Sequence, residues 1–418
     1  MRNILMLALA SAKKRYLALS LTSFSLAVSL FLLLSVETIR HSTKSSFTRT
    51  VSGADLLIGA RGSETGLLLH TLFHMGNASQ NISWHSYEHI SQMDDVAWAL
   101  PFLMGDTHKG FKVIGTTGEF WDYYRYGDHI PLAFSQGAAF ASGYEAVIGS
   151  QVAKKLGYHL GNSIVLAHGS THISGHDHDD KPFTVVGILQ PTGTAVDKSI
   201  YTSLEGIEAL HVDYHAGRRM PIKRSAEAAL HHHSEPESVT SILVGLKSRM
   251  MVLQMQRQIN TYKKESLTAL IPSRTANQLW QSLGNVEKVL RLIAILVVVA
   301  AVIGMLTMLL STLNERRREI AILRSVGAHW YQIVSLFIIE TVGVLLVATV
   351  VSIALLAAVH LSLSSWVLET YGVSWDLQLS MPIVILLVWV WLFALAITLI
   401  PAFRAYSRAL HDGLQIKI

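Results

Sequence analysis

Residues 314–333 read NERRREIAILRSVGAHWYQI and form a short charged segment between two long apolar stretches. The segment contains three consecutive arginines, Arg316 to Arg318, and an apolar run then leads to a Gly-Ala break at Gly327. It holds no grouping of residues typical of catalysis. The pattern predicts a compact amphipathic helix at a membrane surface, where a membrane protein would contact a partner in the cytosol.

The composition of the chain favours a membrane protein. Of its 418 residues, 50% are hydrophobic and 15% are charged, whereas soluble domains carry about 25% charged residues. The chain has no cysteine, which excludes a disulfide framework, a thiolate metal site and a cysteine nucleophile. The net charge of +5 does not indicate nucleic-acid binding, because the basic residues cluster beside the apolar stretches.

Four apolar windows have the length of about 20 residues that crossing the hydrocarbon core requires. They lie at 16–36, 292–313, 341–359 and 377–403. The spans predicted from them are 16–36, 289–313, 334–360 and 377–403. The second is the strongest, because 12 of the 19 residues from Leu292 to Leu310 are Leu, Ile or Val. These residues favour membrane insertion by about −4 to −7 kcal/mol. We therefore expect four transmembrane helices, and the first is a retained anchor because no cleavage site follows it.

The positions of Lys and Arg predict the orientation of the spans. The outer loop 361–376 contains no Lys or Arg. Basic residues occupy the N-terminal segment 1–15, the segment 314–333 and the tail 404–418. We therefore expect both termini in the cytosol, with residues 1–15 at the inner interface and residues 37–288 outside the cytosol.

Residues 37–288 mix two kinds of apolar pattern and predict an α+β domain, which we expect to form two lobes. Ser273 or Thr275 would cap a helix that continues into the second span. The strand-like runs are Ala54–Ile58, Val113–Gly115, Ala146–Ile148, Ser163–Ala167, Thr184–Leu189 and Ser241–Leu246. The helix-like runs are Trp84–Gln92, Gln151–Leu156, Ser203–Leu210 and Arg249–Tyr262. The predicted fold class is a polytopic α-helical membrane protein with four transmembrane helices and a large α+β extracytoplasmic domain between the first and second.

Two short motifs suggest chemistry within this domain. His85, Glu88 and His89 match the H-x-x-E-H pattern of a zinc peptidase, but such short patterns arise easily in a chain with 20 histidines. Residues 110–117 approach a phosphate-binding loop, but Thr116 stands where the loop requires Lys. We therefore favour an ordinary surface helix for the first motif and expect no nucleotide site at the second.

Histidine is concentrated outside the membrane, with 17 of the 20 residues between His41 and His233. The loop 168–180 is the densest region, and imidazole with carboxylate suits zinc, copper or nickel. A solvated loop without a metal is the alternative, because the spacing is looser than a preformed tetrahedral site demands. The candidate ligands are His168, His172, His176, Asp177, His178 and Asp180.

Glu340 lies at the inner edge of the third span, where carboxylates are unusual. It could reach the interface or pair with Arg324, so a structural role is the favoured interpretation.

The chain resembles the permease subunits of the MacB/FtsX/LolCDE class of ABC transporters. The segment 314–333 is similar to the family's loop between the second and third spans, and residues 400–405, IPAFRA, resemble the Pro-Ala motif that closes the fourth span. In the outer domain, residues 146–166 resemble the family's strand–helix–Gly–strand segment, and residues 53–63 resemble a bacterial subgroup. Asp412-Gly413 stands where members often have Asp-Pro.

The resemblance implies a non-catalytic permease in the bacterial inner membrane that works with a separate ABC ATPase. Two permease protomers, as a homodimer, would pair within the membrane lipid, and a periplasmic binding or adaptor protein could join them. ATP would bind the ATPase, and this chain would hold no cofactor unless zinc or another transition metal is involved. Segment 314–333 would be the coupling helix, with contacts from Glu315, Arg316, Arg317, Arg318, Glu319, Arg324 and Gly327.

Three functions therefore compete. The first is a permease that couples ATP hydrolysis in its partner to conformational change of its periplasmic domain, for transport or extrusion. The second is a signalling or activator protein that drives a periplasmic enzyme rather than moving cargo. The third is a zinc peptidase built on His85, Glu88 and His89. The topology and the segment 314–333 favour the first.

Overall fold

The chain is organised in two compact units. The computed structural model describes residues 15–50, 53–77, 80–127, 129–141, 143–168, 181–212, 214–215, 218–219, 225–230, 236–371, 375 and 380–411. One unit, the helical unit, comprises Met1–Ser42, Gly284–Trp366 and Trp375–Ile418, and the other, the sheet domain, comprises Thr43–Leu283 with Val367–Ser374. Each unit has its own hydrophobic core.

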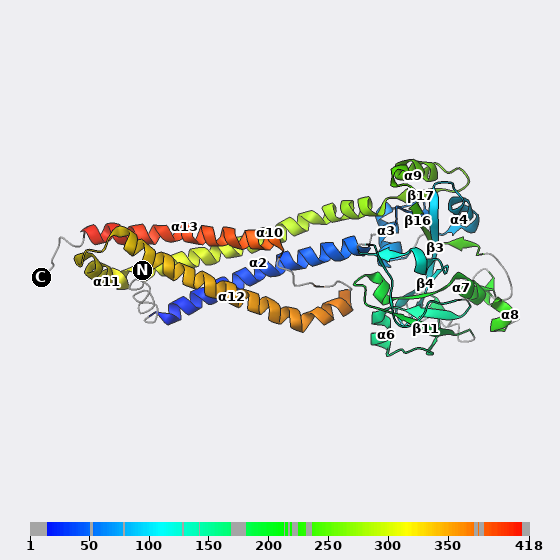
Figure 1. Ribbon diagram of the computed structural model, residues 1–418, viewed down its shortest axis with the longest axis horizontal. Helices are drawn as coiled ribbons and strands as arrows, with labels where there is room; N and C mark the ends of the chain where they lie inside the picture. The colour runs from blue at the N-terminus through cyan, green and yellow to red at the C-terminus, as the bar shows by residue number, and fades with distance from the viewer. Residues whose placement is uncertain are drawn as a thin grey trace. The chain divides into compact units, whose positions relative to one another are not determined.

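The helical unit is built from long apolar helices (Figure 1). Its helices are α2 (Tyr16–Thr50), α10 (Pro272–Ser311), α11 (Leu313–Ser325), α12 (Trp330–Tyr371) and α13 (Met381–His411). Four helices among the described residues are long and apolar enough to cross a membrane: α2, α10, α12 and α13. The predicted fold class is thereby confirmed. The helices extend beyond the apolar windows, since α2 continues past Val36 to Thr50 and α12 past His360 to Tyr371.

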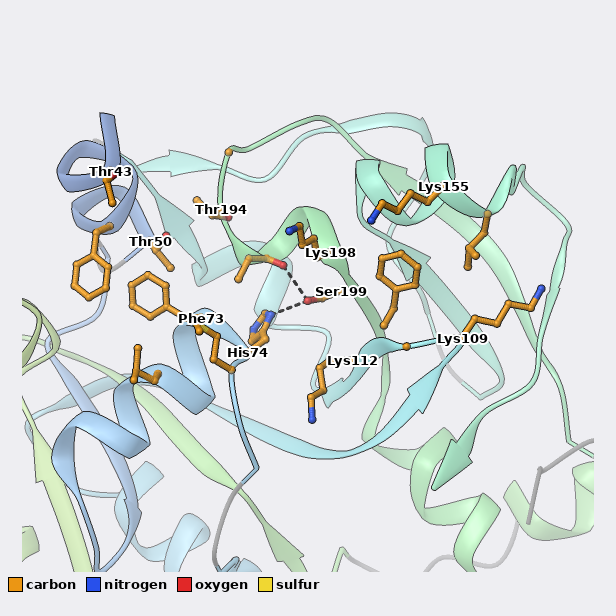
Figure 2. Close-up of a pocket in the computed structure, with 18 residues that line it drawn as sticks. Thr43, Thr50, Phe73, His74, Lys109, Lys112, Lys155, Thr194, Lys198 and Ser199 are labelled. Carbon is orange, nitrogen blue, oxygen red and sulfur yellow. Dashed lines mark hydrogen bonds between the residues drawn. The ribbon is translucent and has the colours of Figure 1, made fainter. Parts of the chain in front are cut away.

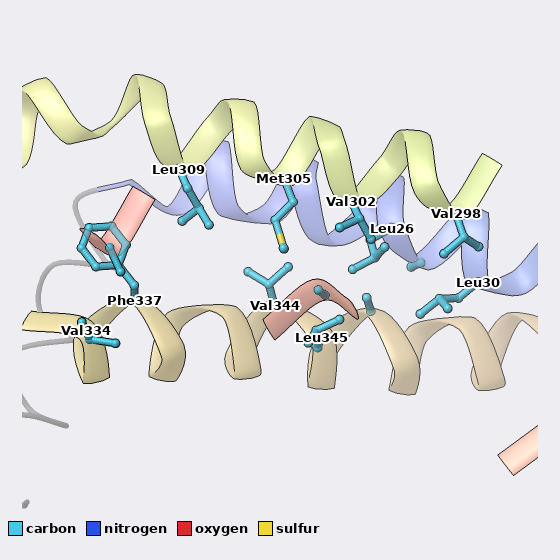
Figure 3. Packing of buried hydrophobic residues seen from close by; sticks show 14 of the residues in the cluster. Leu26, Leu30, Val298, Val302, Met305, Leu309, Val334, Phe337, Val344 and Leu345 are labelled. Carbon is cyan, nitrogen blue, oxygen red and sulfur yellow. The ribbon is translucent and has the colours of Figure 1, made fainter. Parts of the chain in front are cut away.

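Side chains spaced three and four residues apart form the core of the helical unit, because that spacing lines one face of a helix. From α10, Val298, Val302, Met305 and Leu309 are buried in this way. Figure 3 shows them pointing toward side chains of α2 and α12. Since lipid tails are as apolar as these residues, close packing rather than hydrophobic burial holds such helices together.

The sheet domain is organised on an 11-stranded mixed sheet with the order β17-β1-β16-β3-β4-β12-β8-β11-β7, and β10 and β9 pair with β3 and β11 off this path. Neighbours are antiparallel except for the parallel pairs β12–β4 and β11–β8. The strands are β1 (Leu56–Ala60), β3 (Val96–His108), β4 (Phe111–Thr116), β7 (Phe134–Gly137), β8 (Glu145–Ile148), β9 (Ser163–Ile164), β10 (Ala167–His168), β11 (Phe183–Leu189), β12 (Ser199–Ser203), β16 (Ser241–Leu246) and β17 (Leu267–Leu270). Three small ribbons add β2 (Ile82–Ser83) with β15 (Ser238–Val239), β5 (Arg125–Tyr126) with β6 (Ile130–Pro131), and β13 (Tyr214–His215) with β14 (Arg218–Arg219).

Short helices surround this sheet. They are α3 (Glu64–Phe73), α4 (Trp84–Ser91), α5 (Phe120–Tyr123), α6 (Ser150–Leu156), α7 (Leu204–His211), α8 (Ala226–Leu230), α9 (Val252–Asn260), η1 (Ala195–Lys198) and η2 (Arg249–Met251). Ser63, Ser83 and Ser203 cap α3, α4 and α7, and each hydroxyl accepts from the backbone N–H three residues later. Such caps satisfy donors that the first turn of a helix leaves unpaired.

Both faces of the sheet are covered. On β1, Leu57 belongs to one hydrophobic cluster while Leu56 and Ile58 belong to another, because alternate residues of a strand point to opposite faces. The cluster of Leu57 also contains Val147 of β8 and therefore runs along one face of the sheet. On the other face, separate clusters occupy the two ends, one with α4 and α9 and one with α6 and α7.

Candidate functional site

The segment that follows the second span folds as the separate helix α11 and packs against α13. Ile320 of α11 is buried in the same cluster as Ala402 and Ala405 of α13. The small alanines allow the two helix backbones to approach closely. Pro401 lies inside α13 next to these alanines, so the predicted Pro-Ala motif forms the surface on which α11 rests.

Arg324 lies one turn after Ile320 on the face that contacts α13. Its guanidinium carbon lies 5.3 Å from the centroid of the Tyr406 ring, a cation–π distance. The Arg324 side chain, which was predicted to contact the ATPase, therefore points toward α13.

Two exposed apolar side chains lie at the C-terminal end of α11. Ile322 of α11 and Val326, the residue that caps it, are four residues apart, so they lie on one side, and they are 64% and 83% exposed. We call this pair the α11 apolar face. Adjacent exposed apolar side chains can form part of a contact surface. The aromatic residues Trp330 and Tyr331 are also exposed where α12 begins.

A tight turn joins α11 to α12. Gly327 has φ +94°, and its N–H donates to the carbonyl of Arg324 at 2.9 Å while that of Ala328 donates to Leu323 at 2.9 Å. These two bonds form a Schellman motif, which favours glycine at this position. His329 N–H then donates to Gln332 Oε1 at 2.9 Å and caps α12. Gly327, predicted as a partner contact, therefore has a backbone role in the turn.

The remaining predicted contacts lie on α11 as well. Glu319 is half-buried. The side chains of Glu315, Arg316, Arg317 and Arg318 lie outside the described part of the structure, so their contribution to a partner surface stays a prediction.

Ion pairs lie near both ends of the first span. Glu340 of α12 lies 3.8 Å from Arg15, just before α2, and both side chains are nearly buried. Its observed partner is therefore Arg15 and not the Arg324 that sequence reasoning considered. Toward the other end of α2, Arg40 pairs with Glu37 at 2.7 Å and with Glu287 of α10, and Arg291 lies 3.9 Å from Glu37. Sequence analysis did not identify these outer pairs.

The two motifs that suggested chemistry lie on a helix and on a strand of the sheet domain. His85, Glu88 and His89 lie on α4, but His85 Nε2 lies 3.4 Å from Lys264 Nζ and the His89 ring stacks on Tyr262. Residues 110–117 form the β3–β4 turn and strand β4, not a loop that opens a helix.

Of the six predicted metal ligands, the structure describes only one. His168 ends β10, but His172, His176, Asp177, His178 and Asp180 lie outside the described residues. Within the part that the structure describes, no group of three or more His, Asp or Glu side chains could hold a metal ion. Metal binding by the loop 168–180 therefore stays a prediction.

Comparisons with known proteins cover both units. The family of the MacB-like periplasmic core domain matches residues 19–262, and the FtsX-like permease C-terminal family matches residues 291–410. No curated relative matches the sequence. The periplasmic region of MacB from Actinobacillus actinomycetemcomitans is similar at 13% identity over 57% of this chain and 95% of that chain, with a TM-score of 0.33. The extracellular domain of the noncanonic ABC-type transporter YknZ from Gram-positive bacteria is similar at 14% identity over 52% of this chain and 99% of that chain, with a TM-score of 0.31.

The two family matches cover parts of both units, because the first begins at residue 19 in the helical unit and ends at residue 262 in the sheet domain. The first spans more than half of the sequence and includes the sheet domain up to α9, and the second includes α11, α12 and most of the spanning part of α10 and α13. The chain belongs to the MacB/FtsX class of ABC transporter permeases.

Proposed function

We propose that this chain couples ATP hydrolysis by a separate ABC ATPase to a conformational change of its periplasmic domain. The observation that carries the proposal is the α11 apolar face. Ile322 and Val326 are exposed on a helix whose other face is fixed to α13 by Ile320 and Arg324. A rigidly held helix with an exposed apolar face can transmit a push from a bound partner to the spans on either side.

The charged residues of the same helix add to this contact. Glu315 and the arginines Arg316 to Arg318 precede the apolar face along α11. Aromatic, aliphatic and arginine side chains are the residue types that dominate binding energy at protein interfaces. The partner surface would therefore combine an apolar groove for Ile322 and Val326 with acidic groups for the arginines.

The helix α10 supplies the route toward the periplasmic domain. It is continuous from Pro272, two residues after β17, to Ser311, just before α11. Forty helical residues extend for about 60 Å at 1.5 Å each. A movement of α11 would therefore be transmitted along one helix without an intervening loop.

The assembly would lie in the bacterial inner membrane with both chain termini in the cytosol. Two copies of this chain would pair as a homodimer, each with one ATPase, and a periplasmic binding or adaptor protein could dock outside. The arginines of the segment 314–333 and the outer loop 361–376, which lacks Lys and Arg, support this orientation.

The test replaces the α11 apolar face without disturbing the helix. The double variant Ile322→Gln, Val326→Gln keeps helix propensity and removes the apolar contact. We expect copurification of the ATPase with the full chain to fall by about 30-fold, because two contacts of about 1 kcal/mol each are lost.

The matched control is Met250→Gln, Leu253→Gln, which replaces two exposed apolar residues of the sheet domain. It should leave the copurified ATPase unchanged. Equal recovery of ATPase with both double variants, or none with the unaltered chain, would contradict the proposal.

A further inference from the structure

A cavity of about 900 Å³ lies within the sheet domain. Five separate stretches line it: the end of α2, the end of α3, the β3–β4 turn, the end of α6, and η1 with its flanks. Its volume lies in the upper part of the range of about 300–1,000 Å³ that is typical of small-molecule sites. None of these contacts belongs to the coupling surface on α11.

One end of the cavity is aromatic and apolar. The rings of Phe47 from α2 and Phe73 from α3 stack with their centroids 4.4 Å apart, and Leu69 and Met75 add aliphatic surface. In Figure 2, Thr43, Thr50 and Phe73 lie together at this end. Such a surface suits a hydrocarbon chain.

The other end is basic. Lys109, Lys112, Lys155 and Lys198 line the cavity, and none of its eighteen described lining residues is Asp or Glu. Figure 2 shows Lys109 and Lys155 on the side away from Phe73, with Lys112 and Lys198 between. The lysines come from three stretches of the chain, namely the β3–β4 turn with β4, α6 and η1, so the fold brings them together.

The local electrostatics agree with an excess of positive charge. Burial lowers the pKa of Lys198, and the nearby charge of Lys155 lowers it further. Asp197, the acidic neighbour of Lys198 in the chain, raises this pKa in part, and its carboxylate also accepts hydrogen bonds from the backbone N–H groups of Thr192 and Gly193 at 2.8 Å. A bound anion would relieve the repulsion between Lys155 and Lys198.

We propose that this cavity binds an anionic phospholipid, with its phosphate among the four lysines and an acyl chain along Phe47 and Phe73. A free phosphate would leave the aromatic end uncovered, and a zwitterionic lipid would compensate the lysines less well. The source of lipid is close along the chain, because Thr43 follows the apolar window 16–36 by seven residues on the same helix. The proposal goes beyond the coupling function and does not depend on it.

The test uses the full chain in vesicles that contain phosphatidylglycerol with a photoactivatable diazirine on one acyl chain. After illumination, the labelled peptides are mapped by mass spectrometry. We expect label on residues 43–50 and 69–75 in addition to the spans. Phosphatidylcholine with the same acyl chain should label the spans equally and the cavity much less.

Two variants localise the binding. The first is a triple variant that removes three of the lysines: Lys109→Asn, Lys112→Gln, Lys155→Gln. Asparagine is used at position 109 because it tolerates the positive φ found there. Met75→Glu instead adds a carboxylate to the lining and keeps every lysine. Each should reduce cavity labelling by about tenfold, whereas the spans remain labelled as an internal control. The matched control is Lys247→Gln, Lys263→Gln, Lys264→Gln, which removes three exposed lysines of the same domain that do not line the cavity.

Each outcome decides the proposal. Label confined to the spans, equal cavity labelling by phosphatidylcholine, or equal loss in the lysine control would overturn it. Complete displacement of the cavity label by inorganic phosphate would assign the site to a free anion and would also contradict the proposal that it binds a lipid. Since labelling requires no ATPase, its failure is distinct from failure of the coupling proposal.

Discussion

At the residue scale, Glu340 shows how a carboxylate is accommodated in a spanning helix. Carboxylates within membrane helices are costly and are found paired, and Arg15 lies 3.8 Å from Glu340. The pair links the start of α2 to α12, which are far apart in the sequence. Position along the chain placed Glu340 near several arginines, but only the packing of α2 against α12 selects Arg15.

His74 lines the cavity that we propose to bind a lipid, between its aromatic end and its basic end. Its ring is neutral. Its Nδ1 lies 2.6 Å from Ser199 Oγ, and the Ser199 hydroxyl donates to the carbonyl of Ala195 at 3.0 Å. The Ser199 oxygen is therefore left to accept from the His74 Nδ1–H. Burial lowers the pKa of His74 to about 3, so the ring carries no charge at neutral pH.

This shift makes the stability of the sheet domain depend on pH. An unfolded histidine has a pKa of about 6.5, so between pH values of about 6.5 and about 3 the unfolded state binds the extra proton. The free energy of unfolding then falls as pH decreases, by up to about 1.4 kcal/mol per pH unit for this group. We expect His74→Gln to melt with a weaker dependence on pH below about 6.5 than the unaltered chain.

The measurement is the melting temperature of the full chain across this pH range. Some dependence should remain in the variant, because burial also lowers the pKa values of His70 and His108. Glu208 acts in the opposite direction, because burial raises its pKa to about 7. Identical pH slopes for the variant and the unaltered chain would show that His74 is not the group responsible.

At the element scale, the turn between α11 and α12 decides how α11 is held. Alanine at Gly327 would have to adopt φ +94°, which costs about 1–2 kcal/mol for a residue with a Cβ. We expect Gly327→Ala to lower the melting temperature and to weaken ATPase copurification, because α11 would be held less firmly. No neighbouring atom would clash with the new Cβ, so the backbone angle is the cause.

The control for this prediction is Gly343→Ala within α12. Gly343 is helical and has no atom within 4 Å of a built Cβ, and alanine favours a helix over glycine by about 1 kcal/mol. This variant should be as stable as the unaltered chain or more stable. A Gly327→Ala protein that also matched the unaltered chain would show that the Schellman turn is not needed.

Several elements could be predicted from the sequence because their patterns are local. The expected strand Ser241–Leu246 is β16 as observed, and the helix expected to enter the second span is α10. The predicted cap was wrong, because α10 begins at Pro272 and Ser273 and Thr275 lie inside its first turn. Strand β3 was missed, although it is the longest described strand. It contains Pro101 and Gly105, which interrupt the pattern, and long-range pairing with β4 and β16 overrides them.

The candidate sites were less predictable than the elements. Position in the sequence identified α11, but not which of its faces is exposed, because Ile320 and Ile322 are equally apolar. Only packing against Ala402 and Ala405 distinguishes them. The lysines of the cavity are separated by up to 89 positions, from Lys109 to Lys198, so no local pattern could join them.

At the scale of the whole molecule, α10 is one of three helices, with α2 and α12, that have residues in both compact units, and it is the one that leads directly to α11. Its residues up to Leu283 lie in the sheet domain and those from Gly284 in the helical unit. If α10 transmits the ATPase-driven movement, its continuity matters more than the identity of its surface side chains. A flexible insertion should then separate ATP hydrolysis from its effect on the sheet domain.

The last prediction is that inserting Gly-Ser-Gly-Ser after Gly284 abolishes this transmission. Glycine and serine linkers behave as flexible coil, so the ATPase should still bind α11 and hydrolyse ATP while the sheet domain no longer responds. Because the chain has no cysteine, Met250→Cys, at a position 91% exposed, provides a single site for an environment-sensitive dye. The same insertion after Gly76, in an exposed loop of the sheet domain, should preserve the ATP-dependent signal. An unchanged signal with α10 interrupted would mean that the movement reaches the sheet domain by another helix. The candidates would be α2 and α12, because each of them also has residues in both units.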